Sequence, residues 1–275
     1  MEGKSKYHKQ TKSPIYQQLI HNENIKTDKD NVRNDHSKYY IFDESTLITG
    51  GMNIEDKSIY TDVEGKEYID FMVELNSKNY VEKFYDKINY VNWQNQEAGI
   101  EFIVNLKNNI KSNFEIKDKI LELLSSAQKS VTLLMAYIGE KEVTDKIIEI
   151  ANKGIEITIL LPEKANLQND LNMKTLKKLM KETDNKINAY LSKKMVHAKM
   201  IIIDEKIVTL GSANINKNGM TKLSELNVLL DKSNYRGFDE KLKTSLEENF
   251  KDAAKVTNTD TIKYNPIRAL IEQII

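Results

Sequence analysis

Residues 197–214 read HAKMIIIDEKIVTLGSAN, and residues 36–53 read HSKYYIFDESTLITGGMN. The two stretches share a histidine, a lysine, an aspartate, a glycine and an asparagine at identical offsets. In each stretch two apolar runs flank an Asp-Glu pair, which predicts a hairpin of two buried strands. A long pattern that occurs twice in one chain indicates two related halves.

The chain around the second stretch has the pattern of an α/β half. Helical periodicity or strand-like apolar runs alternate along it, and we expect the sheet to be mainly parallel with helices on both faces. The expected helices are 116–128, 142–152, 173–180 and 238–253, and the expected strands are 131–137, 155–161, 187–191 and 226–230.

The first half is expected to be incomplete, because only 35 residues precede His36. They predict one helix at 15–20 and a weak strand near residue 25. A strand at 68–75 and a helix at 81–88 follow the motif, and 90–98 is the expected linker. The expected halves are therefore 1–95 and 96–275, with the first cut short as in the product of a truncated gene.

The repeated residues suit chemistry at a phosphodiester. Side chains two residues apart on a strand share a face, so each histidine lies beside its lysine. Two such sets facing one pocket would hold the non-bridging oxygens with lysines and asparagines. One histidine would attack phosphorus and the other would protonate the leaving oxygen. Which histidine attacks stays open, because the two copies are nearly alike.

The attacking histidine would also need a carboxylate to orient its ring. Glu225 is the candidate in the second half and Asp70 in the first, with Glu64 as a weaker alternative. Asp43 and Asp204 suit hairpin turns, and we favour that role over direct chemistry. No cluster of residues at metal-ligand spacing accompanies the motif, so we expect neither a metal nor another cofactor.

The doubled HxK(x4)D(x6)G(G/S)xN pattern resembles the phospholipase D superfamily, and within it the bacterial cardiolipin synthases. Further segments that resemble this group are 33–36, 50–54, 68–72, 160–162, 224–227 and 264–268. The resemblance implies two pseudo-symmetric α/β halves and phosphatidyl transfer through a phosphohistidine. The implied catalytic residues are His36, Lys38, Asp43, His197, Lys199 and Asp204; the implied phosphate-binding residues are Asn53, Asn214 and Ser212; and the implied supporting residues are Asp70 and Glu225.

Composition narrows the setting. The 275 residues include 41 basic and 41 acidic side chains, which argues against a strongly basic nucleic-acid binder. The absence of cysteine excludes a thiol nucleophile and a disulfide scaffold. No signal peptide is recognisable, and the longest near-apolar run, 131–138, is far shorter than the roughly 20 residues that span a bilayer. We expect a cytoplasmic or peripherally membrane-bound protein, and we interpret 267–275 as a docking helix rather than a membrane anchor.

The leading hypothesis is a phosphatidyltransferase or phospholipase D that acts on a phosphatidylglycerol-like lipid. One alternative is an endonuclease of the same superfamily, against which the neutral charge and the three arginines argue. The other is a catalytically impaired remnant that serves as a lipid-binding or partner module. The sequence does not predict the oligomeric state.

Overall fold

The computed structural model describes residues 35–54, 68–89, 99–106 and 113–274, together with Gln18 and His21. The chain divides into two compact units, 1–33 and 34–275, and the fold below is that of the second unit. Of the expected helix at 15–20 only Gln18 is described, and the strand near residue 25 and the linker at 90–98 lie outside the described residues. The boundary near residue 95 therefore stays a prediction.

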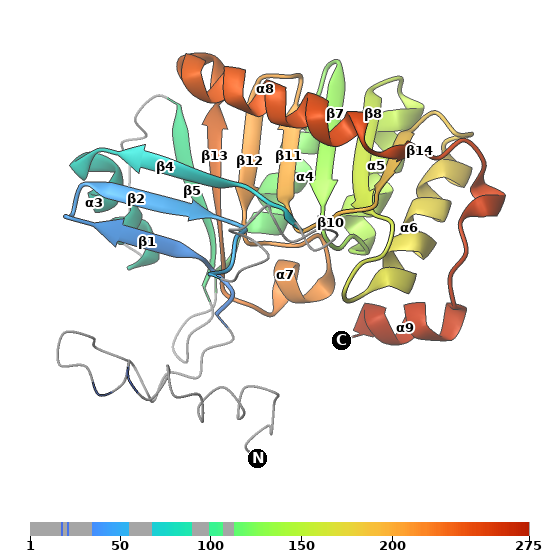
Figure 1. The fold of residues 1–275 in the computed structure, drawn as a ribbon, viewed down its shortest axis with the longest axis horizontal. Coiled ribbons are helices and arrows are strands. Elements are labelled where there is room, and N and C mark those ends of the chain that lie inside the picture. Colours follow the sequence, from blue (N-terminus) through green and yellow to red (C-terminus); the bar gives the residue numbers. More distant parts are fainter. Residues whose placement is uncertain are drawn as a thin grey trace. The chain divides into compact units, whose positions relative to one another are not determined.

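A nine-stranded sheet forms the body of this unit (Figure 1). Strands β7, β8 and β9 pair in parallel, and every other pairing within this sheet is antiparallel. In sheet order the strands are β14 (Ala254–Lys255), β9 (Asn188–Ser192), β8 (Glu156–Pro162), β7 (Ser130–Met135), β11 (Lys199–Ile203), β12 (Ile207–Gly211), β13 (Glu225–Asp231), β5 (Ile100–Leu106) and β6 (Asn113–Phe114).

The expected α/β class is confirmed, but the expected mainly parallel pairing holds only for β7, β8 and β9. Helices α5 (Lys141–Asn152) and α6 (Asn169–Glu182) join these three strands, and a crossover of that length permits parallel pairing. By contrast, β11 and β12 are joined by a tight turn at Asp204-Glu205, which forces them to run antiparallel.

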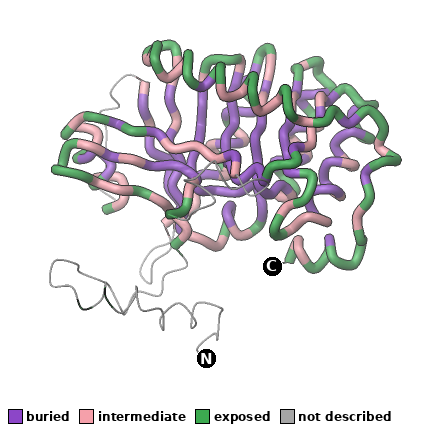
Figure 2. The backbone as a smooth tube through the Cα atoms, in the orientation of Figure 1, coloured by how far each residue is buried: buried purple, intermediate pink, exposed green. Residues whose placement is uncertain are grey.

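Two cores sandwich the sheet. On one face α4 (Ile116–Ser126), α5 and α6 bury residues such as Ile120, Ile147 and Leu176. On the other face α3 (Lys78–Ile88) and α8 (Arg236–Lys251) bury Phe84 and Leu242. Because both faces are covered, the central strands are buried along nearly their whole length, as Figure 2 shows. Shorter elements outside the nine-stranded sheet and its covering helices are β10 (Met195–Val196), α7 (Lys217–Thr221), α9 (Pro266–Ile274) and the 3₁₀ turns Lys232–Asn234 and Thr259–Thr261.

The first motif forms a separate antiparallel sheet, in the order β1 (Tyr39–Phe42), β2 (Thr46–Gly50) and β4 (Met72–Asn76). Its register repeats that of the second motif: Gly50 lies opposite Met72 as Gly211 lies opposite Asn227. Both Asp-Glu turns place their two residues at positive φ, between 50° and 55°, as the two central residues of a type I′ turn require.

Both predicted hairpins are confirmed, with one difference in burial. Strand β11 is buried throughout, because it lies between β7 and β12 under helices on both faces. Strand β1 is partly exposed, because it is an end strand of the smaller sheet. The predicted strand at 68–75 is also interrupted at Asp70-Phe71, which divides it into β3 (Tyr68–Ile69) and β4.

Asn172 on α6 fixes the loop that follows β7. Its Nδ2 donates to the Ala136 carbonyl at 2.7 Å, and its Oδ1 accepts from the Ile138 amide at 2.9 Å. All three groups are buried. The loop between them carries Tyr137, whose position therefore depends on this amide.

We predict that Asn172→Ala lowers the free energy of unfolding by about 2–4 kcal/mol, because it leaves two buried backbone groups unpaired. Equilibrium urea denaturation measures the change. The matched control is Asn152→Ala, which removes one exposed bond to the Glu182 carbonyl and should cost less than about 1 kcal/mol. Equal losses in the two variants would contradict this role for Asn172.

Candidate active site

The two motifs are joined through their backbones in the same way. The amide of His36 donates to the carbonyl of Ser224 at 2.9 Å, and the amide of His197 donates to the carbonyl of Ile69 at 2.8 Å. The residue before each histidine also pairs in parallel with the same segment, Asp35 with Ser224 and Val196 with Ile69. Each histidine therefore lies beside the strand that leads to the acid of the other copy.

The side chains complete this exchange. The Nδ1 of His36 lies 3.1 Å from both carboxylate oxygens of Glu225, and the Nδ1 of His197 lies 2.6 Å from Oδ2 of Asp70. The sequence pattern predicts that each acid orients the histidine of its own half. In the structure, each acid instead pairs with the histidine of the other motif. Glu64, the weaker alternative, lies outside the described residues.

The two lysines of the motifs lie next to their histidines. The Nζ of Lys199 lies 3.0 Å and 3.2 Å from the two ring nitrogens of His197, and that of Lys38 donates to the His36 carbonyl at 2.6 Å. Burial lowers the pKa of Lys199 to about 8, although Asp70 and Glu225 oppose the change. Burial also lowers the pKa of Lys38, against the same two carboxylates. Charged groups of both motifs thus act on one another.

His197 is the more buried of the two histidines. Burial lowers the pKa of His197 despite the hydrogen bond that its ring donates to Asp70, and the charge of Lys199 lowers this pKa further. A neutral His197 that donates its Nδ1 proton to Asp70 keeps a lone pair on Nε2. That is the form required for attack on phosphorus.

A small residue follows the second strand of each motif, Gly51 after β2 and Ser212 after β12. A Cβ on Gly51 would lie 2.2 Å from Oδ1 of Asp70, so only glycine leaves room for that carboxylate. At the equivalent place in the second copy, the Ser212 hydroxyl donates to Glu225 and accepts from the Leu226 amide. Ser212 is thus bonded to the acid that orients His36, which differs from the phosphate-binding role that the resemblance implies.

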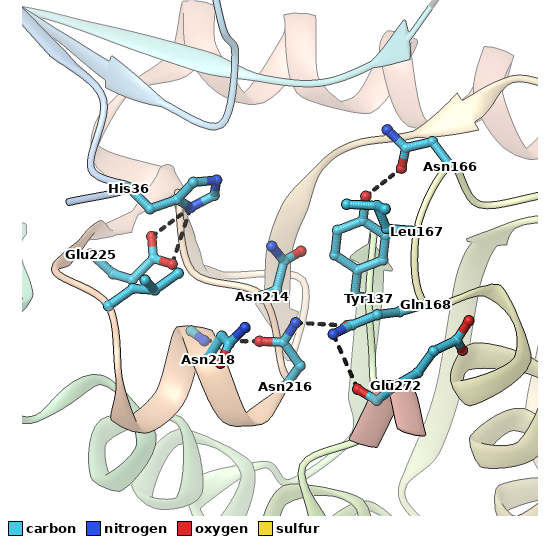
Figure 3. Close-up of a pocket in the computed structure, with 12 residues that line it drawn as sticks. His36, Tyr137, Asn166, Leu167, Gln168, Asn214, Asn216, Asn218, Glu225 and Glu272 are labelled. Atoms are coloured by element: carbon cyan, nitrogen blue, oxygen red, sulfur yellow. Dashed lines mark hydrogen bonds and ion pairs between the residues drawn. The ribbon is translucent and has the colours of Figure 1, made fainter. Parts of the chain in front are cut away.

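A cavity of about 410 Å³ opens beside His36 (Figure 3). Most of its polar side chains are amides, and Tyr137 and Leu167 complete the wall. The Oδ1 of Asn214 is buried and has no hydrogen-bond partner within the described part of the chain, so it can accept a bond from a ligand. The lining residues are His36, Tyr137, Asn166, Leu167, Gln168, Asn214, Asn216, Asn218, Gly219, Leu223, Glu225 and Glu272.

Two tyrosines link the cavity to His197. The ring of Tyr68 stacks on the His197 imidazole with centroids 5.5 Å apart. The Tyr137 hydroxyl donates to Oδ1 of Asn166, whose Nδ2 donates to the Tyr68 hydroxyl at 3.4 Å. Burial raises the pKa of Tyr137, so this hydroxyl keeps its proton.

Three of the predicted site residues lie outside the wall of this cavity. Asn53 is exposed and does not line the cavity. Asp43 and Asp204 occupy the hairpin turns, at the far ends of β1 and β11 from the lysines. Asp204 accepts bonds of 2.7 to 2.9 Å from the amides at 128–130, and these lower its pKa although its burial opposes the change. Asp204 thus has the geometry of a turn residue, which is the role that the sequence pattern favours over direct chemistry.

Several residues of the site had no sequence signal. No sequence motif predicts a site role for the cavity residues Tyr137, Asn166, Gln168, Asn216, Asn218 and Glu272. They come from loops and helix ends whose spacing follows no short motif. Across the described ranges, no group of three or more histidine, aspartate or glutamate side chains is arranged to hold a metal ion. Among the same residues, no helix is both long and apolar enough to span a bilayer.

The chain is similar in sequence to known proteins. Residues 120–253 match the family model described as cardiolipin synthase, PLD-like domain. The chain is 26% identical over 146 residues to cardiolipin synthase 2 of Staphylococcus epidermidis, covering 52% of this chain and 28% of that protein. It is 27% identical over 222 residues to the probable cardiolipin synthase YwiE of Bacillus subtilis, covering 72% and 42%. The chain thus matches less than half the length of these relatives.

The fold has a counterpart among solved structures. Phosphatidylserine synthase of Haemophilus influenzae superposes with a TM-score of 0.67 over 87% of this chain and 68% of that one, at 11% identity. At that identity the likeness concerns the fold alone. The family match over residues 120–253 and the doubled motif make this chain similar to proteins of the phospholipase D superfamily.

We predict opposite shifts of the His197 pKa in two variants. Asp70→Asn should lower it further, because the carboxylate favours the protonated ring, and Lys199→Met should raise it, because a nearby positive charge is removed. Titration of the imidazole signals by NMR measures both, since the chain has only four histidines. Glu74→Gln, an exposed carboxylate on β4, is the control. An unchanged pKa in both test variants would show that neither group acts on His197.

Proposed function

We propose that this protein is a phosphatidyltransferase of the cardiolipin-synthase type, which breaks and re-forms a phospholipid phosphodiester through a phosphohistidine. The observation that carries the proposal is the pair of exchanged histidine–carboxylate contacts, His36 with Glu225 and His197 with Asp70. The buried Lys199 and the half-buried Lys38 beside them supply positive charge for a phosphate. The family match and the names of the matched relatives support the same chemistry.

In the first step we assign the attack to His197. Its Nε2 lone pair forms a bond to phosphorus, and the bond from phosphorus to the headgroup oxygen breaks. Lys38 and Lys199 stabilise the charge on the equatorial oxygens of the five-coordinate transition state. His36, protonated and oriented by Glu225, donates its proton to the departing alcohol oxygen.

In the second step the roles of His36 reverse. Neutral after the first step, it takes the proton of an incoming hydroxyl, whose oxygen attacks the phosphorus and releases His197. A lipid alcohol as acceptor gives a transfer product, and water gives phosphatidic acid. His36 suits this role because it faces the cavity through which an alcohol can approach (Figure 3).

The lining of the cavity supports a neutral, polyhydroxylated headgroup such as that of phosphatidylglycerol. Amide groups both donate and accept hydrogen bonds, as hydroxyls do. Among the residues that the structure describes, no lysine or arginine lines the cavity, so these residues offer a further negative group no ionic partner. Because such lipids reside in bilayers, we propose that the protein works while bound peripherally to a membrane.

The direct test is to incubate the full chain with phosphatidylglycerol vesicles and to measure cardiolipin and phosphatidic acid by mass spectrometry. Phosphatidylcholine vesicles and plasmid DNA are the comparison substrates. We expect product from phosphatidylglycerol and none from phosphatidylcholine or DNA. Metal-independent cleavage of DNA without any lipid product would favour the endonuclease, and the absence of every product and of a covalent phosphohistidine would overturn the proposal.

We predict that His36→Ala and His197→Ala each reduce turnover by at least about 1000-fold, because the reaction needs both an attacking and a proton-transferring histidine. With a lipid analogue whose leaving group needs no proton, His36→Ala should accumulate a phosphatidyl group on His197, as peptide mass spectrometry would show. A phosphatidyl group found instead on His36 of the His197→Ala variant would reverse the assignment.

We predict that kcat/KM falls as the pH rises through about 8, because Lys199 loses its positive charge there. Arginine stays protonated at this pH, so Lys199→Arg should move the fall to higher pH. The exposed Lys206→Arg is the control and should leave the profile unchanged. An alkaline limb that does not respond to Lys199→Arg would show that another group causes it.

A further inference from the structure

Helix α9 has its polarity reversed with respect to the protein interior. Its four large apolar residues follow the helical spacing i, i+3, i+4 and i+7, which places them on one stripe. All four side chains lie in solvent: Ile267 is 72% exposed, Leu270 56%, Ile271 51% and Ile274 60%. The opposite side of the helix carries the buried Ala269 together with Glu272 and Gln273.

Polar contacts hold the helix in this orientation against α6. Glu272 accepts from the Leu171 amide at 2.8 Å, and Gln273 accepts from Lys174 at 2.9 Å. The Asn265 side chain caps the first turn of α9, and the backbone amide of Asn265 donates to Asp170 at 2.7 Å. The apolar stripe therefore faces outward because the polar face is bound to the protein.

Helix α9 borders the cavity through Glu272, on the side opposite the stripe. Gln168 donates to the backbone carbonyl of Glu272, and both residues line the cavity together with His36. Their neighbour Leu167 is 66% exposed and lies on the rim. A protein partner seated on this surface would cover the opening that substrate must use, whereas a bilayer would present its lipids to it.

Basic groups lie around α9. Arg268 is exposed on the flank of the stripe, and Lys222 donates to the carbonyl of Ile274 at the end of the stripe. Lys174 donates to Gln273 on the opposite side of the helix. Glu272 and Asp170, two acidic groups in contact with this segment, are both engaged by backbone amides. Apolar residues bordered by cations match the boundary between acyl chains and anionic headgroups.

We propose that α9 lies in the plane of an anionic bilayer, with Ile267, Leu270, Ile271 and Ile274 inserted among the acyl chains and the cavity mouth beside them. Leu167 enters the same boundary. The proposal rests on the proposed function in one respect, that the cavity receives a phospholipid. It assigns a surface to the membrane contact that the function requires.

The test measures co-sedimentation of the full chain with vesicles of phosphatidylglycerol and phosphatidylcholine in equal parts. The variant Leu270→Ser/Ile274→Ser should lose binding by at least about tenfold, because two apolar side chains no longer enter the lipid. The matched control is Phe42→Ser/Tyr85→Ser, which removes two apolar side chains of similar exposure, 53% and 43%, from β1 and α3. These lie at the end of the fold away from α9 (Figure 1).

Turnover separates this proposal from the proposed function. With soluble, short-chain phosphatidylglycerol, the α9 variant should react like the wild type, whereas with vesicles its rate should fall with its binding. If the variant loses vesicle binding but the wild type shows no turnover of any lipid, the membrane surface is supported and the proposed function is wrong. If the wild type turns over the short-chain lipid but the variant binds vesicles as the wild type does, the proposed function is supported and the membrane surface is wrong.

Two further outcomes would overturn the α9 proposal. One is equal loss of binding in the control variant, which would indicate a general effect of surface hydrophobicity. The other is a wild-type dimer in sedimentation equilibrium that the α9 substitutions dissociate, because a second copy of the chain would then cover the stripe.

Discussion

The exchange of carboxylates between the two motifs is the contact on which the rest of the site depends. Asp70 and Glu225 are almost wholly buried, and a buried carboxylate without a partner is strongly destabilising. Each finds its histidine in the other copy of the motif. Neither copy therefore assembles a complete site by itself, and the two must dock before either histidine is oriented.

The backbone makes this exchange possible. In both places a residue before the histidine pairs in parallel with the segment before the acid, which aligns ring and carboxylate. Gly51 leaves space for Asp70, while Ser212 uses the corresponding position to bond Glu225. The two copies thus keep one geometry with different small residues. The difference gives Glu225 a hydroxyl donor, and the glycine at the corresponding position offers Asp70 none.

The same docking creates the electrostatics of the site. Lys38 and Lys199 are drawn out of water, and carboxylates from both motifs partly restore their charged forms. A phosphodiester that enters this region meets fixed positive charge without the cost of reorganising solvent. Under the proposed function, the amide-lined cavity receives the lipid headgroup and the outward stripe of α9 contacts the bilayer that supplies the lipid.

The repeated motif by itself determined the hairpins and the histidine–lysine pairs, because these follow from apolar runs, turn residues and offsets within eighteen residues. The α/β class was determined by the alternating helical and strand-like segments around the motif. The sequence also indicated the two acids, but only tertiary structure decided their partners, since His36 and Glu225 are 189 positions apart and Asp70 and His197 are 127 apart. The antiparallel majority of the large sheet, the amides of the cavity and the outward face of α9 were decided in the same way. Short-range patterns carry propensity and burial, whereas which distant surfaces meet depends on how the whole chain packs.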